Sequence, residues 1–204
     1  MIKKTIFFIL FSLNVFSQKV ENDSLNKISF DYDRAYDGVN RKMNYSLLGL
    51  KFPNVNTKDI NGELYESNKA KRLVFYTFWK KSCAPCITEI DMLNQLQSKF
   101  SKDVDFIGIT CKSKETILKF NEKYSSHFRQ LSVSENIITN LFLYSGYPAS
   151  FLVFDGEIIE ISTGGPVDIN SKYFHVLLYS TYSKFRKEIE KKLNEIKKWC
   201  YTLS

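Results

Sequence analysis

Two cysteines three positions apart, Cys83 and Cys86, have the spacing that most directly predicts chemistry in this sequence. A continuous apolar run precedes them and Pro85 lies between them, so Cys83 falls in the turn between a buried strand and a helix. A sulfur at a helix N-terminus faces free N–H groups and the helix dipole, which favour its thiolate form. We therefore predict a redox pair, in which Cys83 attacks the disulfide of a partner and Cys86 resolves the mixed disulfide.

The same spacing has two other interpretations, half of a zinc site or an inert structural bridge. A zinc site needs about four ligands. The sequence offers no second closely spaced pair, since His127 and His175 stand apart. We interpret Cys111 and Cys200 as small buried hydrophobes, and a regulatory thiol at Cys111 or a Cys111–Cys200 disulfide stays open. The sequence predicts no metal and no cofactor.

Two segments carry a family resemblance. Residues Phe78 to Glu89 resemble the active-site segment of thioredoxin-like proteins, most closely the extracytoplasmic TlpA/ResA type within the redoxin (AhpC/TSA-like) superfamily. Residues Tyr147 to Val153, followed by Asp155-Gly156, resemble the cis-proline loop and hairpin of that family. The resemblance covers residues 47–166. It implies a thiol:disulfide oxidoreductase that acts on protein thiols and disulfides, more often as a reductase, and that is fed by an upstream dithiol donor.

The resemblance also assigns roles to further residues. Pro148 is expected to be cis and to face the two cysteines, which leaves the backbone of Tyr147 free to pair with an extended substrate strand. Trp79 is expected to complete the substrate-binding set. Glu89 lies three residues after Cys86, hence on the same helical face, and is expected to take the Cys86 proton when that sulfur becomes the nucleophile. The alternatives are a trans turn at Pro148 and a solvated surface glutamate at Glu89.

Three positions depart from the thioredoxin pattern. Thr77 replaces an aspartate found two residues before the tryptophan, which shifts proton handling towards Glu89. Ser82 stands where thioredoxins tend to have tryptophan before the first cysteine. Tyr147 is bulkier than the usual residue before the cis-proline. The last two bear on substrate choice and redox potential rather than on the reaction.

The same scaffold supports other functions. A peroxidase of the peroxiredoxin type would need a Pro-x-x-x-Thr-x-x-Cys pattern, and the residues before Cys83 and Cys86 do not supply it. The alternative from a different class is copper binding or delivery, or a non-catalytic binding module. Related copper-delivery proteins use a wider cysteine spacing and a later histidine ligand, neither of which is found here.

The elements that must position these residues follow from hydrophobic patterning. Apolar runs predict buried strands, and apolar residues at helical spacing predict helices. These segments are strands at 73–79 and 104–110 and helices at 86–100 and 113–124. The dipeptides Asn61-Gly62 and Asp155-Gly156 predict hairpin turns. The resulting order predicts an α/β protein with a central mixed β-sheet flanked by helices, as in the thioredoxin fold.

An extended helix is predicted after Gly164-Gly165-Pro166. Its packing stripe runs from Leu178 to Cys200 at spacings of three and four. The opposite face, between Lys184 and Lys198, has seven basic and three acidic residues. Such a face is able to lie on an anionic membrane surface, to dock an acidic partner, or simply to be solvated.

The first residues predict export. Lys3 and Lys4 precede an apolar run over 6–13 and a small residue, Ser17, which is the pattern of a secretory signal. The run is shorter than the roughly 20 residues that span a bilayer. A buried N-terminal strand or helix is the alternative. We expect a protein of the periplasm or cell envelope.

The predicted organisation has four parts. They are a signal peptide at 1–17, a tether or irregular extension at 18–46, a thioredoxin-like core at 47–166, and a helical segment at 167–204 partly packed on the core. The formal charge of +7 over 204 residues is typical of a solvated surface. No zinc-finger spacing or basic arm indicates a nucleic-acid partner.

Overall fold

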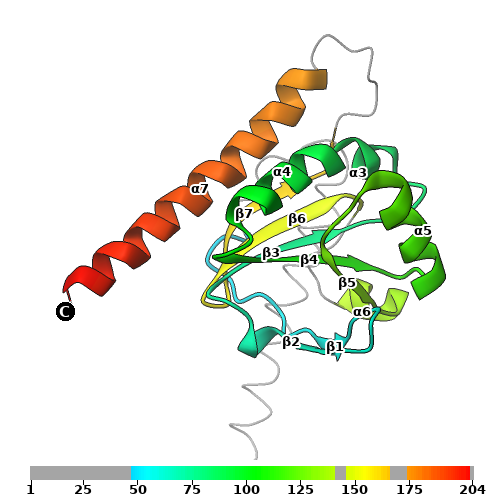
Figure 1. The fold of residues 1–204 in the computed structure, drawn as a ribbon, viewed down its shortest axis with the longest axis horizontal. Helices are drawn as coiled ribbons and strands as arrows, with labels where there is room; N and C mark the ends of the chain where they lie inside the picture. The colour runs from blue at the N-terminus through cyan, green and yellow to red at the C-terminus, as the bar shows by residue number, and fades with distance from the viewer. Residues whose placement is uncertain (1–46, 141–145, 166–173, 203–204) are drawn as a thin grey trace, which may run out of the picture. The chain divides into compact units, whose positions relative to one another are not determined.

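A five-stranded mixed sheet lies at the centre of the fold, in the order β5-β4-β3-β6-β7 (Figure 1). Its strands are β3 (Leu73–Phe78), β4 (Val104–Thr110), β5 (Arg129–Ser132), β6 (Ala149–Phe154) and β7 (Glu157–Thr163). Strand β3 pairs in parallel with β4 and antiparallel with β6, so the sheet is mixed as predicted. All six residues of β3 are buried, as its continuous apolar run predicts for a central strand.

The computed structural model describes residues 47–140, 146–165 and 174–202, which belong to one unit within residues 44–204. Its helices are α3 (Ala84–Thr88), α4 (Ile90–Phe100), α5 (Lys114–Tyr124), α6 (Glu135–Asn140) and α7 (Phe174–Thr202). A small antiparallel pair, β1 (Asn56–Lys58) and β2 (Leu64–Glu66), flanks the predicted Asn-Gly turn. The predicted signal peptide and tether lie outside the described residues.

The structure differs from the predicted elements at two places. The single helix expected over 86–100 is two helices, because Glu89 ends α3 and begins α4. Strand β5 and helix α6 were not predicted, since each is short and β5 has only two buried residues, Gln130 and Leu131. Strand β5 forms by adding to the edge of β4, in parallel, rather than through a pattern of its own.

Helices α4 and α7 pack together over one face of the sheet (Figure 1). Phe185 and Ile189 of α7 are fully buried there, with the ring of Phe185 4.9 Å from that of Phe75 in β3. Lys99 of α4 and Glu190 of α7 form an ion pair at 2.6 Å. The predicted packing stripe of the C-terminal helix is thus present where the structure describes its side chains.

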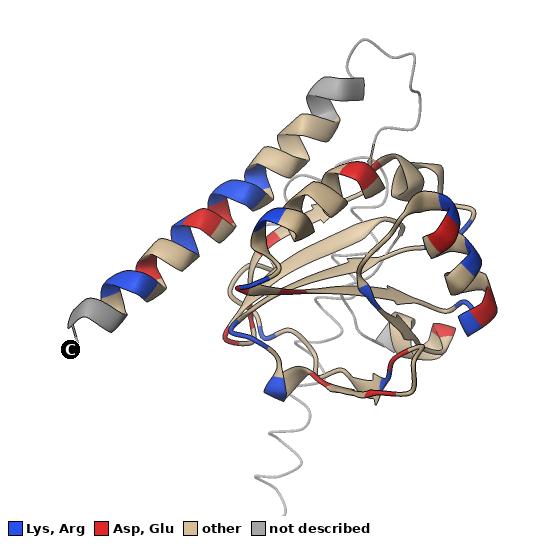
Figure 2. Cartoon of the chain, viewed as in Figure 1, with Lys and Arg blue, Asp and Glu red and all other residues tan. Residues whose placement is uncertain are grey.

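The charged face of α7 is largely engaged in ion pairs along its own surface. Figure 2 shows basic and acidic residues alternating along this helix. The helix pairs Lys191 with Glu188 and Lys192 with Glu195, each three residues apart. Across the part of the chain that is described, no helix is long and apolar enough to cross a membrane.

Both edges of the sheet are partly occupied. At β7, the N–H of Gly49 donates to the carbonyl of Ile158 at 2.8 Å, and Lys184 of α7 donates to the carbonyl of Ile161 at 3.0 Å. Lys184 also pairs with the nearly buried Glu160 at 2.6 Å. At β5, Asp59 forms a bridge to Leu131.

Candidate active site

The two predicted redox cysteines form a disulfide at the start of α3, with their Cα atoms 5.2 Å apart. Cys83 caps the helix, and its sulfur accepts a hydrogen bond from the N–H of Cys86 at 3.2 Å. Pro85 lies in the first helical turn, where no N–H is needed. Cys83 is half-buried, whereas Cys86 is almost fully buried. The outer sulfur is therefore the one that a partner can reach.

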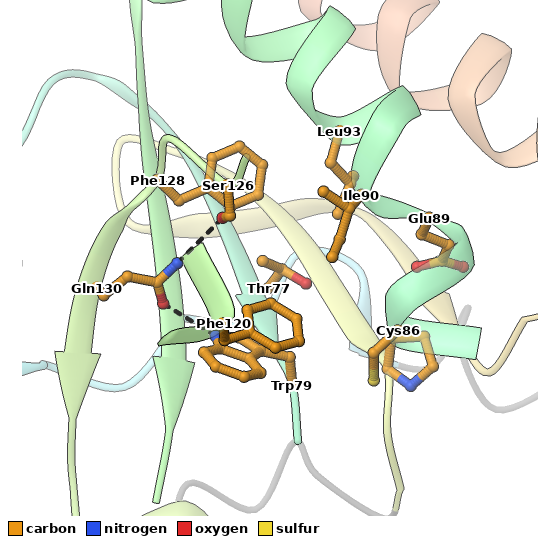
Figure 3. A pocket seen from close by; sticks show the side chains of 11 residues that line it. Thr77, Trp79, Cys86, Glu89, Ile90, Leu93, Phe120, Ser126, Phe128 and Gln130 are labelled. Atoms are coloured by element: carbon orange, nitrogen blue, oxygen red, sulfur yellow. Dashed lines mark hydrogen bonds between the residues drawn. The ribbon is translucent and has the colours of Figure 1, made fainter. Parts of the chain in front are cut away.

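The predicted proline loop lies beside the inner cysteine. The peptide bond between Tyr147 and Pro148 is cis, as expected. Pro148 and Cys86 line the same small cavity, of about 20 Å³, which is room for one water molecule (Figure 3). The other residues that line this cavity are Thr77, Trp79, Glu89, Ile90, Leu93, Phe120, Ser126, Phe128 and Gln130. The structure thus gathers the cis-proline, Cys86, Glu89 and Trp79 around one space.

Glu89 is buried at the junction of α3 and α4, with 4% of its surface exposed. Burial raises the pKa of its carboxyl group to about 8. The dipoles of α3 and α4 act on this charge with opposite signs, and the loss of hydration decides the direction of the shift. A carboxyl group with such a pKa is suited to exchange protons near neutral pH. The alternative of a solvated surface glutamate does not describe this residue.

Trp79 is buried in the lining of the same cavity as Cys86 and is not exposed at the surface. It is 5% exposed and its ring stacks on Phe120 at 4.0 Å. Its indole N–H donates to Oε1 of Gln130 at 2.9 Å, and Nε2 of Gln130 donates to Ser126 at 3.3 Å. A side chain at Gly108 would collide with Gln130, so the glycine makes room for this link. No motif in the sequence marks Gln130 as a site residue.

Thr77 fills the position of the thioredoxin aspartate with a neutral, buried hydroxyl group. It accepts a hydrogen bond from the hydroxyl of Ser150 in β6 at 3.1 Å. Because neither partner carries a charge, Glu89 is the acidic residue of the cavity lining. The shift of proton handling from position 77 to Glu89 stays a prediction.

A polar cluster flanks the proline loop. Lys80 pairs with Glu135 of α6 at 2.6 Å and lies 4.4 Å from the centre of the Tyr147 ring. Cys111 is a free, half-buried thiol, so it forms no disulfide with Cys200 here. Burial and a hydrogen bond with Glu135 raise the pKa of the Cys111 thiol. Lys80 thus contacts both Glu135 and the ring of Tyr147 in this cluster.

Comparisons with known proteins agree with this geometry. The AhpC/TSA family model matches residues 48–161. Thiol-disulfide oxidoreductase ResA of Bacillus cereus is 29% identical over 117 residues, which are 55% of this chain and 68% of that protein. ResA of Geobacillus kaustophilus is 26% identical over 121 residues, 57% of this chain and 70% of the relative.

Solved structures share the fold. The thioredoxin domain of a thiol-disulfide oxidoreductase from Bacteroides vulgatus superposes with a TM-score of 0.54 and 22% identity, covering 68% of this chain and 96% of that one. A thiol:disulfide interchange protein from a Bacteroides species gives 0.51 and 23%, covering 56% and 80%. The predicted thioredoxin fold is confirmed.

Proposed function

This chain belongs to the AhpC/TSA family and is a thioredoxin-like thiol:disulfide oxidoreductase of the ResA type, and we propose that it is exported and reduces disulfides in protein substrates through Cys83 and Cys86. The observation that carries the proposal is the cysteine pair itself, a half-buried sulfur that caps a helix and a buried one behind it. Such a pair can pass two electrons to a substrate and end as the disulfide that the structure contains.

The reaction begins with both cysteines reduced. The Cys83 thiolate attacks one sulfur of the substrate disulfide, that S–S bond breaks, and the released substrate thiolate takes up a proton. Cys86 then loses its proton and attacks the sulfur of Cys83. The mixed disulfide breaks, the second substrate thiol leaves, and the Cys83–Cys86 disulfide forms. An upstream dithiol donor must return two electrons and two protons to the enzyme before the next cycle.

The neighbouring residues have supporting roles in this proposal. Glu89, in its carboxylate form, accepts the proton of Cys86 when that buried thiol becomes the nucleophile. The backbone of Tyr147, next to the cis-proline, pairs with an extended segment of the substrate. Trp79 donates to Gln130 and stacks on Phe120, and it supports the site from its buried side.

The proposals that the protein is exported and that it acts as a reductase rest on the family resemblance and on the N-terminal pattern. The basic and apolar residues at 3–13 support a secretory signal, and the TlpA/ResA resemblance supports an extracytoplasmic reductase. We expect a mature form that begins after Ser17, which N-terminal sequencing of the exported protein would reveal. A midpoint potential near that of thioredoxin, about −270 mV, is expected for a reductase, and one near −120 mV would indicate an oxidase.

The test of the mechanism compares two cysteine variants. Cys83→Ser is expected to lose reduction of a disulfide-containing protein by at least about 1,000-fold, because the attacking sulfur is gone. Cys86→Ser is expected to accumulate a mixed disulfide between Cys83 and the substrate, seen as a mass increase that dithiothreitol removes. Reduction by Cys83→Ser at the wild-type rate would overturn the mechanism. Cys111→Ser serves as the control and is expected to retain activity.

A further inference from the structure

The backbone after β7 lies directly against the Glu89 carboxyl group. A Cβ atom built on Gly165 would lie 2.7 Å from Oε1 of Glu89 and 3.2 Å from Cβ of Pro85. Real Cβ atoms essentially never come within 3.0 Å of another heavy atom, so a side chain at position 165 would force something to move. The missing side chain is what allows this contact.

This segment is anchored on the N-terminal side of the contact. The N–H of Gly164 donates to the carbonyl of Pro148 at 2.8 Å, which ties the segment to the cis-proline loop. Strand β7 continues its pairing with β6 as far as Thr163. Nζ of Lys184 in α7 donates to the carbonyl of Ile161, two residues before Thr163. The segment therefore runs from the cis-proline loop past Pro85 to Glu89 at the end of α3.

Burial raises the pKa of Glu89, and among the described residues no charged group contributes to this rise. Of the described residues that line the cavity with Glu89, Cys86 of α3 is the other group able to titrate, once its disulfide is reduced. The other polar residues that line this cavity are neutral: Thr77 and Trp79 from the end of β3, Gln130 from β5 and Ser126 from the segment before it. Because burial is what raises this pKa, the pKa should respond to any change that lets water reach the carboxyl group.

We propose that Gly165 is a positioning residue for Glu89, whose missing side chain lets the backbone close over the carboxyl group and keep it from solvent. The inference deepens the proposed function and rests on it, because it concerns the proton that Cys86 gives up. Gly165 acts through Glu89 and not by contact with the substrate.

The experiment measures the pH dependence of kcat/KM for reduction of a protein disulfide, with Gly165→Ala as the variant. The wild type is expected to show an inflection near the pKa of Glu89, about 8. In Gly165→Ala the added methyl group displaces the carboxyl group or the backbone, and water enters. The inflection is then expected to move down by about one pH unit, towards the ordinary value of a glutamate.

Two further variants separate positioning from loss of stability. Glu89→Gln is expected to remove the inflection, and Gly165→Ala added to it should change the profile no further. Ile189→Val, a core change in α7, should lower stability but leave the inflection in place. The inference is wrong if Gly165→Ala keeps the wild-type inflection, if its effect persists in the Glu89→Gln background, or if Ile189→Val shifts the inflection equally.

Failure of the proposed function has a different signature, since the wild type would then show no dithiol-dependent reduction at any pH. Gly165→Ala could also fail to fold because of the clash itself. The double variant Gly165→Ala, Glu89→Ala removes the carboxyl group that causes the clash. Recovery of folding in the double variant would support the contact, and persistent failure would overturn it.

Discussion

At the scale of single residues, Glu89 is placed where two physical effects oppose each other. It lies between the C-terminus of α3, whose dipole disfavours a negative charge, and the N-terminus of α4, whose dipole favours one. It is also buried, and burial disfavours the same charge, so the pKa rises to about 8. The protein thus carries a carboxyl group that is protonated when folded and ionised when unfolded over much of the physiological pH range.

This difference has a consequence for stability. Between the ordinary pKa near 4.5 and the folded value of about 8, the folded state holds a proton that the unfolded state has released. The contribution of Glu89 to the free energy of unfolding is therefore largest below about pH 4.5. It declines as the pH rises to about 8, by something on the order of 5 kcal/mol.

Glu89→Gln lacks this titration. We expect the stability of the variant relative to the wild type to increase steadily from pH 5 to pH 8, because only the wild type loses the contribution. Urea denaturation of the oxidised protein at several pH values measures the difference. A difference that stays constant over this range would contradict the burial of an ionisable group at this position.

The sequence predicted some site residues and missed others for a physical reason. Cys83, Cys86 and Pro148 belong to local patterns that can be recognised without the fold. Gln130 and Gly165 act through contacts with Trp79 and Glu89, which lie 51 and 76 positions earlier. Their roles exist only once the sheet has brought these segments together, so no local pattern records them.

At the scale of elements, the turn between β1 and β2 is attached to β5 through Asp59. The carboxylate of this buried residue accepts hydrogen bonds from the N–H of Asn61 at 2.8 Å and of Glu63 at 3.0 Å. It also pairs with Arg129 of β5 at 2.8 Å. Burial alone would raise the pKa of Asp59, but these partners together hold it below its ordinary value.

Asp59→Asn keeps the size of the side chain and removes its charge. We expect the variant to lose about 1–3 kcal/mol of stability at pH 7, since Arg129 and the two N–H groups lose an ionised acceptor. The contribution of Asp59 is present above the unfolded pKa near 3.9 and is lost as the pH falls through the lower folded value. Chemical denaturation at pH 7 and pH 3 tests both statements, and an equal loss at the two pH values would refute the second.

The elements that patterning predicted are those with long buried runs, such as β3 and β4. Strand β5 was missed because four residues with polar ends carry little periodicity, and it depends on β4 for its hydrogen bonds. The break at Glu89 was missed for a related reason. The apolar spacing continues through it from Cys86 to Ile90 and Leu93, so the pattern describes one helix where the backbone forms two.

At the scale of the whole molecule, α7 is joined to the sheet by two buried side chains and by Lys184, which pairs with Glu160 and donates to the carbonyl of Ile161. Phe185 lies against Phe75 of the central strand, and Ile189 lies in the same cluster. The predicted boundary at residues 166 and 167 lies outside the described residues and stays a prediction, as does contact of the helix with a membrane surface.

Phe185→Ala is expected to destabilise the protein by about 3–5 kcal/mol, because it removes a fully buried ring from the contact between α7 and β3. Tyr179→Ala is the matched control on the same helix, since that ring is 65% exposed, and is expected to change stability by no more than about 0.5 kcal/mol. Thermal or urea unfolding distinguishes the two. Equal effects would mean that α7 does not depend on its buried face.

The occupied edges of the sheet bear on how the protein behaves at high concentration. An open edge strand is a template on which a second chain can add, and this is a common route to aggregation. Here residues 49–51 bond to one end of β7, Lys184 places a charge on its middle, and Asp59 bridges to β5 at the opposite edge. These contacts leave fewer free backbone groups at the two edge strands with which another chain could pair. The same few contacts therefore support solubility and limit where on the sheet an extended substrate segment can dock.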